Sequence, residues 1–428
     1  MVFDLKLTKF WTRLAFGVLS LAACSLLVVM ITASYVIGTL ADHRVAATRD
    51  MLAVPVEYFP GSARLNARMA AAELSESGGD LASASLHARR AVGLSPHDYR
   101  FRLILAQIQE TEGDRAAAEQ SLEAARARAP NYWNVRYRLG NLLIREGKLA
   151  ESLDELRIAV SANGDLLPGT LDLVWRASHG DVNAVRTVAG SGAKARLKLA
   201  DFLLTMSRAT EAVEVFSSIP RGDRLASATE SSAFLNALVA AAKLESARGL
   251  WSEMAGAGSP ATLVWNGGFE SDFSKDFSQF DWSFGRSDYA RLAIDTTVAH
   301  SGSRSLRIEF AGRDTTRLDN EIKQLVLVRP GASYTLECYA KTREMQSPEG
   351  PRVVVSAVSN GGSWIAASEP VPGGSNDWQR LAVSFTAPPS AKGGAAAVFV
   401  SIKRKPKFSY DEPTRGTIWL DDFSMKEQ

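Results

Sequence analysis

The chain has 428 residues, which at roughly 100–200 residues per domain is enough for two or three domains. Its 49 Lys and Arg nearly balance its 47 Asp and Glu, which argues against a nucleic-acid-binding protein or one held to an anionic surface by charge alone. Its two cysteines, Cys24 and Cys338, lie in an apolar segment and in a predicted strand, so we expect a fold that forms without a disulfide.

The first feature along the chain is an uncharged, apolar segment over residues 14–41. It is longer than the roughly 20 residues that cross a bilayer as a helix, and longer than the apolar core of a cleaved signal peptide, so we predict a retained transmembrane anchor. Lys6, Lys9 and Arg13 precede it, and this basic bias places residues 1–13 in the cytoplasm. In a bacterium, the protein would be a single-pass inner-membrane protein whose bulk is periplasmic.

The same segment has an alternative interpretation as a lipoprotein signal. Leu21-Ala22-Ala23-Cys24 resembles a bacterial lipoprotein cleavage box, which would place a lipid on the cysteine. Lipoproteins usually become polar after that cysteine, whereas this chain stays apolar, which favours a plain anchor. Residues 42–60 then form a connector in which Pro55 and Pro60 disfavour a helix.

An internal repeat follows, from about residue 61 to residue 255. Turn signals at Gly79-Asp80, Gly113-Asp114 and Gly147-Lys148 are 34 residues apart, the period of tetratricopeptide repeats. Small residues recur in phase where two helices must approach closely: Ala72, Ala84, Ala91, Ala106, Ala118, Ala125, Gly140, Ser152 and Ala159. The segment resembles a tetratricopeptide array, with three clear repeats over residues 65–164 and less regular helical pairs after them. Such an array is a right-handed solenoid in which each hairpin buries its apolar side on its neighbours.

Two functions suit such an array: a surface for protein partners, or a rigid spacer between the membrane and the next domain. Tyr132, Trp133 and Tyr137 could line a groove, but large residues at helical spacing more often belong to the core, and we predict core. The arginines of the same region are predicted to form a solvated face. They are Arg126, Arg128, Arg136, Arg138 and Arg145.

Dense Gly and Pro over residues 256–263 predict a linker that ends the helices. Beyond it, residues 264–428 alternate apolar and polar side chains in short runs, which is typical of an antiparallel β-sandwich. We predict strands at 291–295, 305–310, 321–328, 333–341, 352–358, 379–387, 395–403 and 416–425. Tyr334, Leu336, Cys338 and Ala340 are expected to face the core, as are Leu381, Val383 and Phe385. About eight strands suit a jelly roll of two sheets.

Six motifs of this region, taken together, resemble carbohydrate-binding modules of families 4 and 9. They are Asn266-Gly267-Gly268-Phe269-Glu270, Trp282, His300-Ser301-Gly302-Ser303-Arg304-Ser305-Leu306, Val328-Arg329-Pro330-Gly331-Ala332-Ser333-Tyr334, Trp378-Gln379-Arg380 and Trp419-Leu420-Asp421-Asp422-Phe423. The resemblance covers essentially all of residues 264–428 and implies a galactose-binding-like jelly roll. Trp282 and Trp378 match family positions that are often structural, so we expect them in the core.

The resemblance also implies a structural calcium ion, since such modules commonly hold one where the first and last strands meet. The implied ligands are the acids Glu270 and Asp421 or Asp422, with carbonyl oxygens near Ser301 and Gly302. Calcium prefers such a shell of oxygen atoms. The alternative is that these acids cap turns or pair with Arg304. No other cofactor is expected.

A further implication is sugar binding, which combines aromatic faces that stack on a pyranose ring with polar groups that meet its hydroxyls. The predicted site residues are Trp364, Tyr339, Glu337, Arg286, Asn360, Lys403 and Tyr410. Trp364 is the first choice as a stacking platform, because a Gly-rich loop such as residues 360–364 rarely buries a tryptophan.

Catalytic motifs are missing from the sequence. It contains no H-E-x-x-H, G-x-S-x-G, P-loop or paired-cysteine zinc motif, and the two predicted domains leave no room for a catalytic one. We therefore expect a non-catalytic, membrane-anchored, extracytoplasmic glycan-binding protein that acts in the assembly or export of a surface polysaccharide such as exopolysaccharide or O-antigen. The alternative is a periplasmic protein scaffold whose jelly roll binds no sugar.

Overall fold

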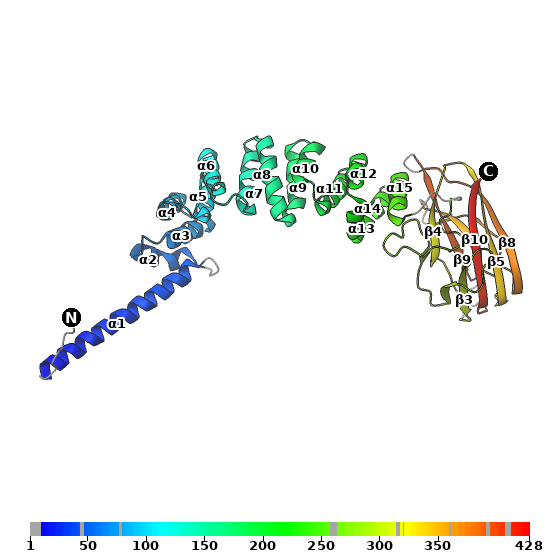
Figure 1. The fold of residues 1–428 in the computed structure, drawn as a ribbon, viewed down its shortest axis with the longest axis horizontal. Helices are drawn as coiled ribbons and strands as arrows, with labels where there is room; N and C mark the ends of the chain where they lie inside the picture. The colour runs from blue at the N-terminus through cyan, green and yellow to red at the C-terminus, as the bar shows by residue number, and fades with distance from the viewer. Residues whose placement is uncertain are drawn as a thin grey trace. The chain divides into compact units, whose positions relative to one another are not determined.

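The computed structural model describes residues 10–42, 47–76, 79–256, 263–313, 317–319, 321–358, 362–390, 394–406 and 412–428. Within these residues, fifteen α-helices precede ten β-strands (Figure 1). The predicted fold class is confirmed: an apolar N-terminal helix, all-α repeats and a two-sheet β-sandwich. By its internal contacts, the chain forms two compact units, residues 1–190 and 191–428.

The first unit begins with α1 (Phe10–Ala41), in which Arg13–Leu40 is long and apolar enough to cross a membrane. The next helix, α2 (Arg49–Tyr58), contradicts the prediction that the prolines of the connector disfavour a helix, because Pro55 lies inside it. Pro55 cannot donate a helical hydrogen bond. The helix forms nevertheless because its buried Leu52 and Val56 pack into an apolar cluster with residues of the next helix.

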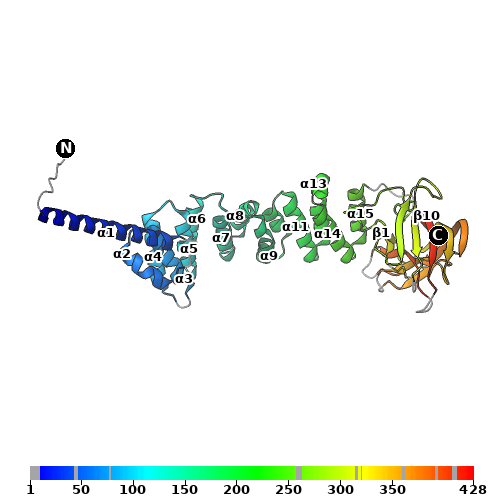
Figure 2. The ribbon, with the colours of Figure 1, turned by 90° about the horizontal axis from the view of Figure 1, so that it is seen from below.

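Three helical hairpins follow, as predicted for residues 65–164 (Figure 2). They consist of α3 (Ala63–Ser75) with α4 (Leu81–Leu94), α5 (Tyr99–Glu112) with α6 (Arg115–Arg126), and α7 (Trp133–Arg145) with α8 (Leu149–Ala162). The Gly-Asp turn has two roles: Gly113 ends α5 at φ 85°, and the Asp114 carboxylate accepts a hydrogen bond from the Ala117 amide at 3.0 Å to cap α6. Gly140 allows close packing, since a Cβ there would lie 2.7 Å from Leu156 Cγ.

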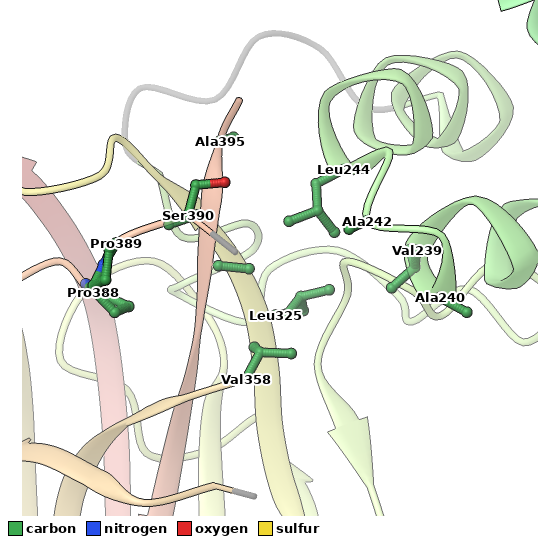
Figure 3. Close-up of a pocket in the computed structure, with 12 residues that line it drawn as sticks. Val239, Ala240, Ala242, Leu244, Leu325, Val358, Pro388, Pro389, Ser390 and Ala395 are labelled. Carbon is green, nitrogen blue, oxygen red and sulfur yellow. The ribbon is translucent and has the colours of Figure 1, made fainter. Parts of the chain in front are cut away.

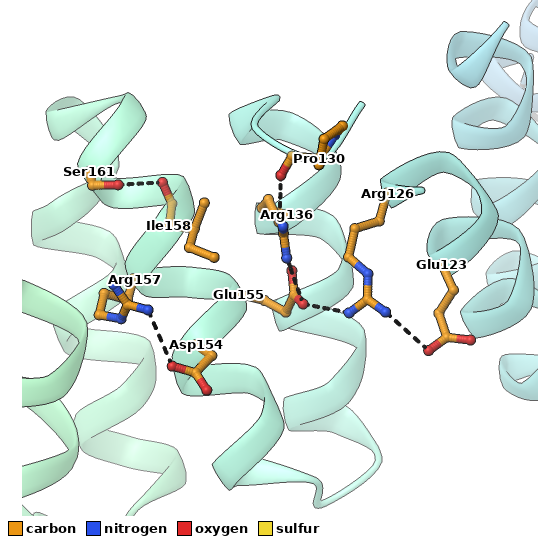
Figure 4. A network of polar contacts seen from close by, with 9 residues as sticks. All are labelled: Glu123, Arg126, Pro130, Arg136, Asp154, Glu155, Arg157, Ile158 and Ser161. Atoms are coloured by element: carbon orange, nitrogen blue, oxygen red, sulfur yellow. Dashed lines mark hydrogen bonds and ion pairs between the residues drawn. The ribbon is translucent and has the colours of Figure 1, made fainter. Parts of the chain in front are cut away.

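An arginine network joins the second and third hairpins (Figure 4). Glu155 of α8, only 5% exposed, accepts hydrogen bonds from Arg126 Nη1 at 2.7 Å and from Arg136 Nη1 at 2.9 and 2.8 Å. The prediction of a solvated arginine face is therefore wrong for Arg136, whose side chain is 15% exposed. The sequence pattern showed the run of arginines but not the acid that they enclose.

The remaining helices are less regular, as the weakening of the repeat suggested. The first unit ends with a 3₁₀ turn, Gly164–Leu166, and with α9 (Leu167–Ala177) and α10 (Val182–Ala189). The second unit begins with α11 (Ala193–Thr205), α12 (Ala209–Ser217), α13 (Arg221–Ala226), α14 (Ala228–Ala240) and α15 (Leu244–Ala255). Phe216 and Phe234 stack at 4.7 Å between ring centroids and lie in the interior of these helices.

The sandwich has two five-stranded antiparallel sheets within the described residues. Sheet A has the order β1-β4-β9-β6-β7, built from β1 (Ser283–Phe284), β4 (Ile322–Val328), β9 (Ala396–Lys403), β6 (Arg352–Ala357) and β7 (Trp364–Ala367). Sheet B has the order β2-β3-β10-β5-β8, built from β2 (Ala290–Asp295), β3 (Ser305–Ala311), β10 (Arg415–Glu427), β5 (Ser333–Gln346) and β8 (Gly374–Thr386). All eight predicted strands are present. The sequence missed the two short edge strands β1 and β7.

The core lies between the sheets, and the predicted alternation is confirmed there. Tyr334, Leu336, Cys338 and Ala340 of β5 are all buried in one apolar cluster with Leu381, Val383 and Phe385 of β8. Trp282 is buried in the same cluster, as expected. The prediction for Trp378 is wrong: it is half-buried on the outer face of sheet B, on the same side as Tyr339.

Helix α15 packs against the sandwich within the second unit. The indole of Trp251 is fully buried, and its Nε1 donates a hydrogen bond to the Phe277 carbonyl at 2.8 Å. Its ring lies edge-to-face with Trp265 at 5.6 Å and Phe280 at 5.8 Å. These contacts bind the last helical hairpin to the start of the sandwich. The predicted linker falls largely on residues 257–262, which lie outside the described residues.

Candidate functional site

The opening motif of the sandwich meets the loop between β2 and β3. Glu270 accepts hydrogen bonds from the Ser303 amide at 2.8 Å, the Ser303 hydroxyl at 2.7 Å and the Arg304 amide at 2.9 Å. These hydrogen bonds, those from the Ser303 amide and hydroxyl first, lower the pKa of Glu270. Arg304 itself pairs with Asp272 rather than with Glu270. The loop amides therefore hold Glu270 as a carboxylate.

The closing motif supplies two further acids to the same place. Asp421 is fully buried and accepts hydrogen bonds from the amides of His300 at 2.8 Å and Ser301 at 3.3 Å. Burial is the largest cause that raises its pKa, to about 6. Asp422, at φ 54°, accepts hydrogen bonds from the Ser301 hydroxyl at 2.7 Å and lies 2.6 Å from His300 Nδ1.

The predicted calcium ligands are thus brought together around Gly268. A Cβ at Gly268 would lie 3.4 Å from Asp422 Oδ1, 3.7 Å from Asp421 Oδ1 and 3.8 Å from Glu270 Cγ. Among the described residues, no three His, Cys, Asp or Glu side chains form a group that could hold a metal by themselves. A metal here would need backbone oxygens as well, and a set of carboxylates and carbonyls suits calcium. The buried Asp421 charge is what such a cation would neutralise.

The outer face of sheet B holds Tyr339 and Glu337, but their groups are already engaged. The ring of Tyr339 stacks on His300 at 3.7 Å between centroids and 12° between planes, and Trp378 lies against the same histidine at 5.5 Å. Glu337 forms an ion pair with Arg380. With one face of the Tyr339 ring covered, this surface offers less stacking area than a free aromatic ring.

The outer face of sheet A carries a row of side chains that crosses four strands. In register, Leu325 of β4 lies opposite Phe399 of β9, Phe399 lies opposite Ser356 of β6, and Ser356 lies opposite Trp364 of β7. Residues opposite each other in an antiparallel pair share one face. The neighbours of Leu325, Phe399 and Trp364, such as Val326, Val398 and Ile365, belong to or pack against the core, so the row itself faces outward.

Trp364 is the exposed end of this row. It is 40% exposed, whereas Leu325 and Ser356 are buried and Phe399 is half-buried. Because neighbouring strands are about 4.8 Å apart, the Phe399 and Trp364 positions are separated by about 10 Å across β6, a span that a short oligosaccharide covers. We call this row the floor of the candidate site. Three of its side chains are buried or half-buried, and Trp364 at one end is exposed, which suits stacking on sugar rings.

An apolar recess of about 340 Å³ adjoins this floor (Figure 3). Helices α14 and α15 and the turn between them contribute Val239, Ala240, Ala242 and Leu244 to it. The sandwich contributes Leu325, Val358, Pro388, Pro389, Ser390, Ala395, Ala396 and Ala397. Leu325 belongs to both the floor and the recess. The last helical hairpin therefore forms a wall on one side of the outer face of sheet A.

The structure does not gather the predicted sugar-site residues in one place. Trp364 and Lys403 lie on sheet A, and Tyr339 and Glu337 lie on sheet B. Arg286 is exposed just after β1, at the opposite edge of sheet A from Trp364. Asn360 and Tyr410 lie outside the described residues. Lys403 is buried and pairs with Asp319 at 2.8 Å.

Sequence reasoning missed Phe399 and Ser356, and it placed Trp364 in a loop, whereas it begins β7. The alternation of β9 did contain a signal for Phe399, since Ala396, Val398 and Val400 are the inward positions. Nothing in the sequence showed that β6 separates Phe399 from Trp364, because strand order depends on long-range pairing.

Residues 261–406, which are less than half of the chain, match the model of the family 4 and 9 carbohydrate binding domain. No curated protein matches the chain. A solved structure described as "CBM4 structure and function" is 22% identical and covers 39% of this chain and 99% of its own, with a TM-score of 0.29. A family 16 carbohydrate binding module is 16% identical over 39% of this chain and 99% of its own, at 0.26.

Among helical structures, MamA from residue 41 onward, from Desulfovibrio magneticus RS-1, is 15% identical and covers 40% of this chain and 81% of its own, with a TM-score of 0.27. TM-scores this low support no inference about function, so the description of the C-terminal domain rests on the family match at residues 261–406. The chain therefore has a carbohydrate-binding domain of the family 4 and 9 type at its C-terminal end, preceded by helical repeats.

Proposed function

We propose that the protein is a non-catalytic glycan-binding protein, anchored in the bacterial inner membrane by α1 with residues 1–13 in the cytoplasm and the bulk of the chain in the periplasm. Its sandwich would hold a polysaccharide on the outer face of sheet A, in the assembly or export of a surface polysaccharide. The observation that carries the glycan site is the outward row from Leu325 to the exposed Trp364. The family match at residues 261–406 supports the ligand class.

Loss of the platform tests this site. Truncating a hot-spot aromatic residue costs about 2 kcal/mol or more, and Trp364 is the exposed platform of the row, so Trp364→Ala should weaken glycan binding by roughly 10- to 100-fold. Binding would be measured with the full chain in detergent, on an array of bacterial surface polysaccharides. Tyr339→Ala is the matched control on sheet B and should bind like wild type. Loss of binding in Tyr339→Ala with none in Trp364→Ala would move the site to sheet B.

We also propose that calcium ties the opening motif to the closing motif, with Glu270, Asp421, Asp422 and oxygens near Ser301 and Gly302 as its ligands. A bound cation would offset the burial of the Asp421 charge and so stabilise the sandwich. A ligand present at about 100 times its dissociation constant stabilises a fold by roughly 2.7 kcal/mol.

Chelation tests the calcium proposal. Treatment with a calcium chelator should lower the melting temperature of the second unit by roughly 5 °C or more, given about 2–4 °C per kcal/mol for a unit of this size. Glu270→Ala should remove most of this sensitivity. Asp272→Ala should retain it, because Asp272 lies on the same loop but is 91% exposed and pairs with Arg304. Chelation without effect on wild-type melting would rule the metal out.

A second candidate function is a protein scaffold that works through the helical repeats. The observation that favours it is a hollow of about 440 Å³ in the first unit, lined by residues of α5, α7 and α9: Gln107, Glu110, Tyr137, Arg138, Asn141, Ile144, Arg145 and Leu173. Its polar side chains could meet the backbone and side chains of a peptide. Proteins that co-purify with the chain and remain bound after removal of the sandwich would favour this function.

A further inference from the structure

Each aromatic ring of the outer face of sheet A has a lysine beside it. Lys323 Nζ lies 5.1 Å from the centroid of the Phe399 ring, and Lys405 Nζ lies 4.9 Å from the centroid of the Trp364 ring. Lys323 is two positions from Leu325 on β4 and so shares its outward face, while Lys405 follows the end of β9. Each ammonium group lies over its ring, so a sugar that stacks on that face must displace the flexible lysine side chain, whose ammonium group then meets the edge of the sugar.

Two acids of this part of the sandwich are already paired with other cations, and Glu321, two positions before Lys323, accepts a hydrogen bond from the Asp319 amide at 2.6 Å. Asp319 pairs with Lys403 at 2.8 Å, and Glu349 pairs with Arg352 at 2.5 Å. Although burial opposes it, the hydrogen bond from Lys403 and the charges of Lys403, Lys405 and Arg317 lower the pKa of Asp319. Across the described residues, no carboxylate lies within 4.0 Å of the ammonium group of Lys323 or Lys405. Two ammonium groups therefore lie at the rings of this face without an acid as a partner in the part of the chain that the structure describes.

Sheet B pairs its Lys341 with an acid, although its Arg343 lies over the Trp419 ring at 5.1 Å. On its outer side, Lys341 pairs with Asp377 at 2.7 Å and Arg380 pairs with Glu337. These cations are neutralised by acids of the sandwich itself. The two lysines of sheet A instead have rings as neighbours, an arrangement that leaves their charges available to a ligand.

We propose that the glycan bound on sheet A is acidic and carries carboxylate groups, as uronic acids do, which meet Lys323 and Lys405 while its rings stack on Phe399 and Trp364. This inference rests on the proposed function, and it narrows the ligand from glycans in general to anionic ones. A neutral glycan would use the rings but leave both ammonium groups without a partner. Because the lysines are solvent-accessible, each should contribute a modest, salt-dependent share of the affinity.

The experiment uses the full chain in detergent and an array of acidic bacterial polysaccharides, each printed in native form and after chemical reduction of its carboxyl groups. Wild type should bind the native polymers at least tenfold more tightly than the reduced ones, and less tightly as the salt concentration rises. Lys323→Met and Lys405→Met keep the unbranched stem and remove the charge. Each should weaken binding to native polymers by roughly two- to fivefold, and their binding to reduced polymers should not change.

Lys341→Met is the matched control, since it makes the same change in net charge on sheet B, and it should bind like wild type. Equal binding of native and reduced polymers by wild type would overturn the acidic ligand and leave the proposed function intact. Equal losses in Lys341→Met and the sheet A variants would also overturn it, because net charge rather than position would be responsible. If wild type binds no polymer in either form, the inference and the proposed glycan-binding function fall together.

Discussion

Trp251→Ala should destabilise the second unit by roughly 3–5 kcal/mol, the range for truncating a large buried aromatic side chain. The indole is fully buried between α15 and the sandwich, so its removal leaves a cavity that the surroundings fill only in part. The change also deprives the Phe277 carbonyl of its hydrogen-bond donor and removes the edge-to-face contacts with Trp265 and Phe280. Differential scanning calorimetry of the full chain should show a transition lowered by about 10 °C.

Trp364→Ala is the matched control for this experiment. It makes the same chemical change at a side chain that is 40% exposed, so its effect on stability should stay near 0.5 kcal/mol. The two variants thus separate stability from glycan binding: Trp251→Ala should lower the melting temperature most, and Trp364→Ala should lower binding most. Equal melting temperatures for both would contradict a structural role for the α15 contact.

A second contact supports the same expectation for the helical hairpin. Gln279 Nε2 of the sandwich donates hydrogen bonds to the Ser232 hydroxyl at 2.8 Å and to Asn236 Oδ1 at 3.1 Å, both on α14. The guanidinium of Arg248 on α15 lies 5.6 Å from the centroid of the Phe280 ring of the sandwich. Together these contacts keep α14 and α15 beside sheet A. Residues of these helices can therefore line one side of the candidate glycan site.

Much of the fold could be predicted because its signals are local. The turn signals recur every 34 residues because each ends one helix and begins the next, and at Gly113-Asp114 the glycine ends α5 in a left-handed conformation while the aspartate caps α6. The alternation in β5 correctly gave the core face, because a strand buried on one side must repeat every second residue. The helix at Pro55 was not predictable in this way, since it depends on packing against α1 and α3.

The candidate sites show the same difference between what local sequence signals predict and what depends on long-range packing. Glu270 and the two acids of the closing motif could be assigned through the resemblance, and the fold brings them together although they are far apart in sequence. The sugar site could not be predicted from the sequence, because the sequence does not show which of Trp364 and Tyr339 has a ring that is free to stack on a sugar. Only strand order separates them onto different sheets, and only packing shows that His300 covers one face of Tyr339.

In the first unit, Glu155→Ala should destabilise the junction between the second and third hairpins by about 2–4 kcal/mol. Glu155 is 5% exposed and is the shared partner of Arg126 and Arg136. Among the described residues, its loss leaves the half-buried Arg136 guanidinium with the Pro130 carbonyl as its remaining partner. Amide hydrogen exchange of the full chain should accelerate in α6, α7 and α8.

Glu123→Ala is the control, because Glu123 meets the same Arg126 at 3.7 Å but is 52% exposed, and its effect should stay below about 0.5 kcal/mol. Similar exchange rates in the two variants would mean that the buried acid does not hold the hairpins together. Faster exchange in Glu155→Ala alone would show that the buried carboxylate, by pairing with Arg126 and Arg136, holds the second and third hairpins together.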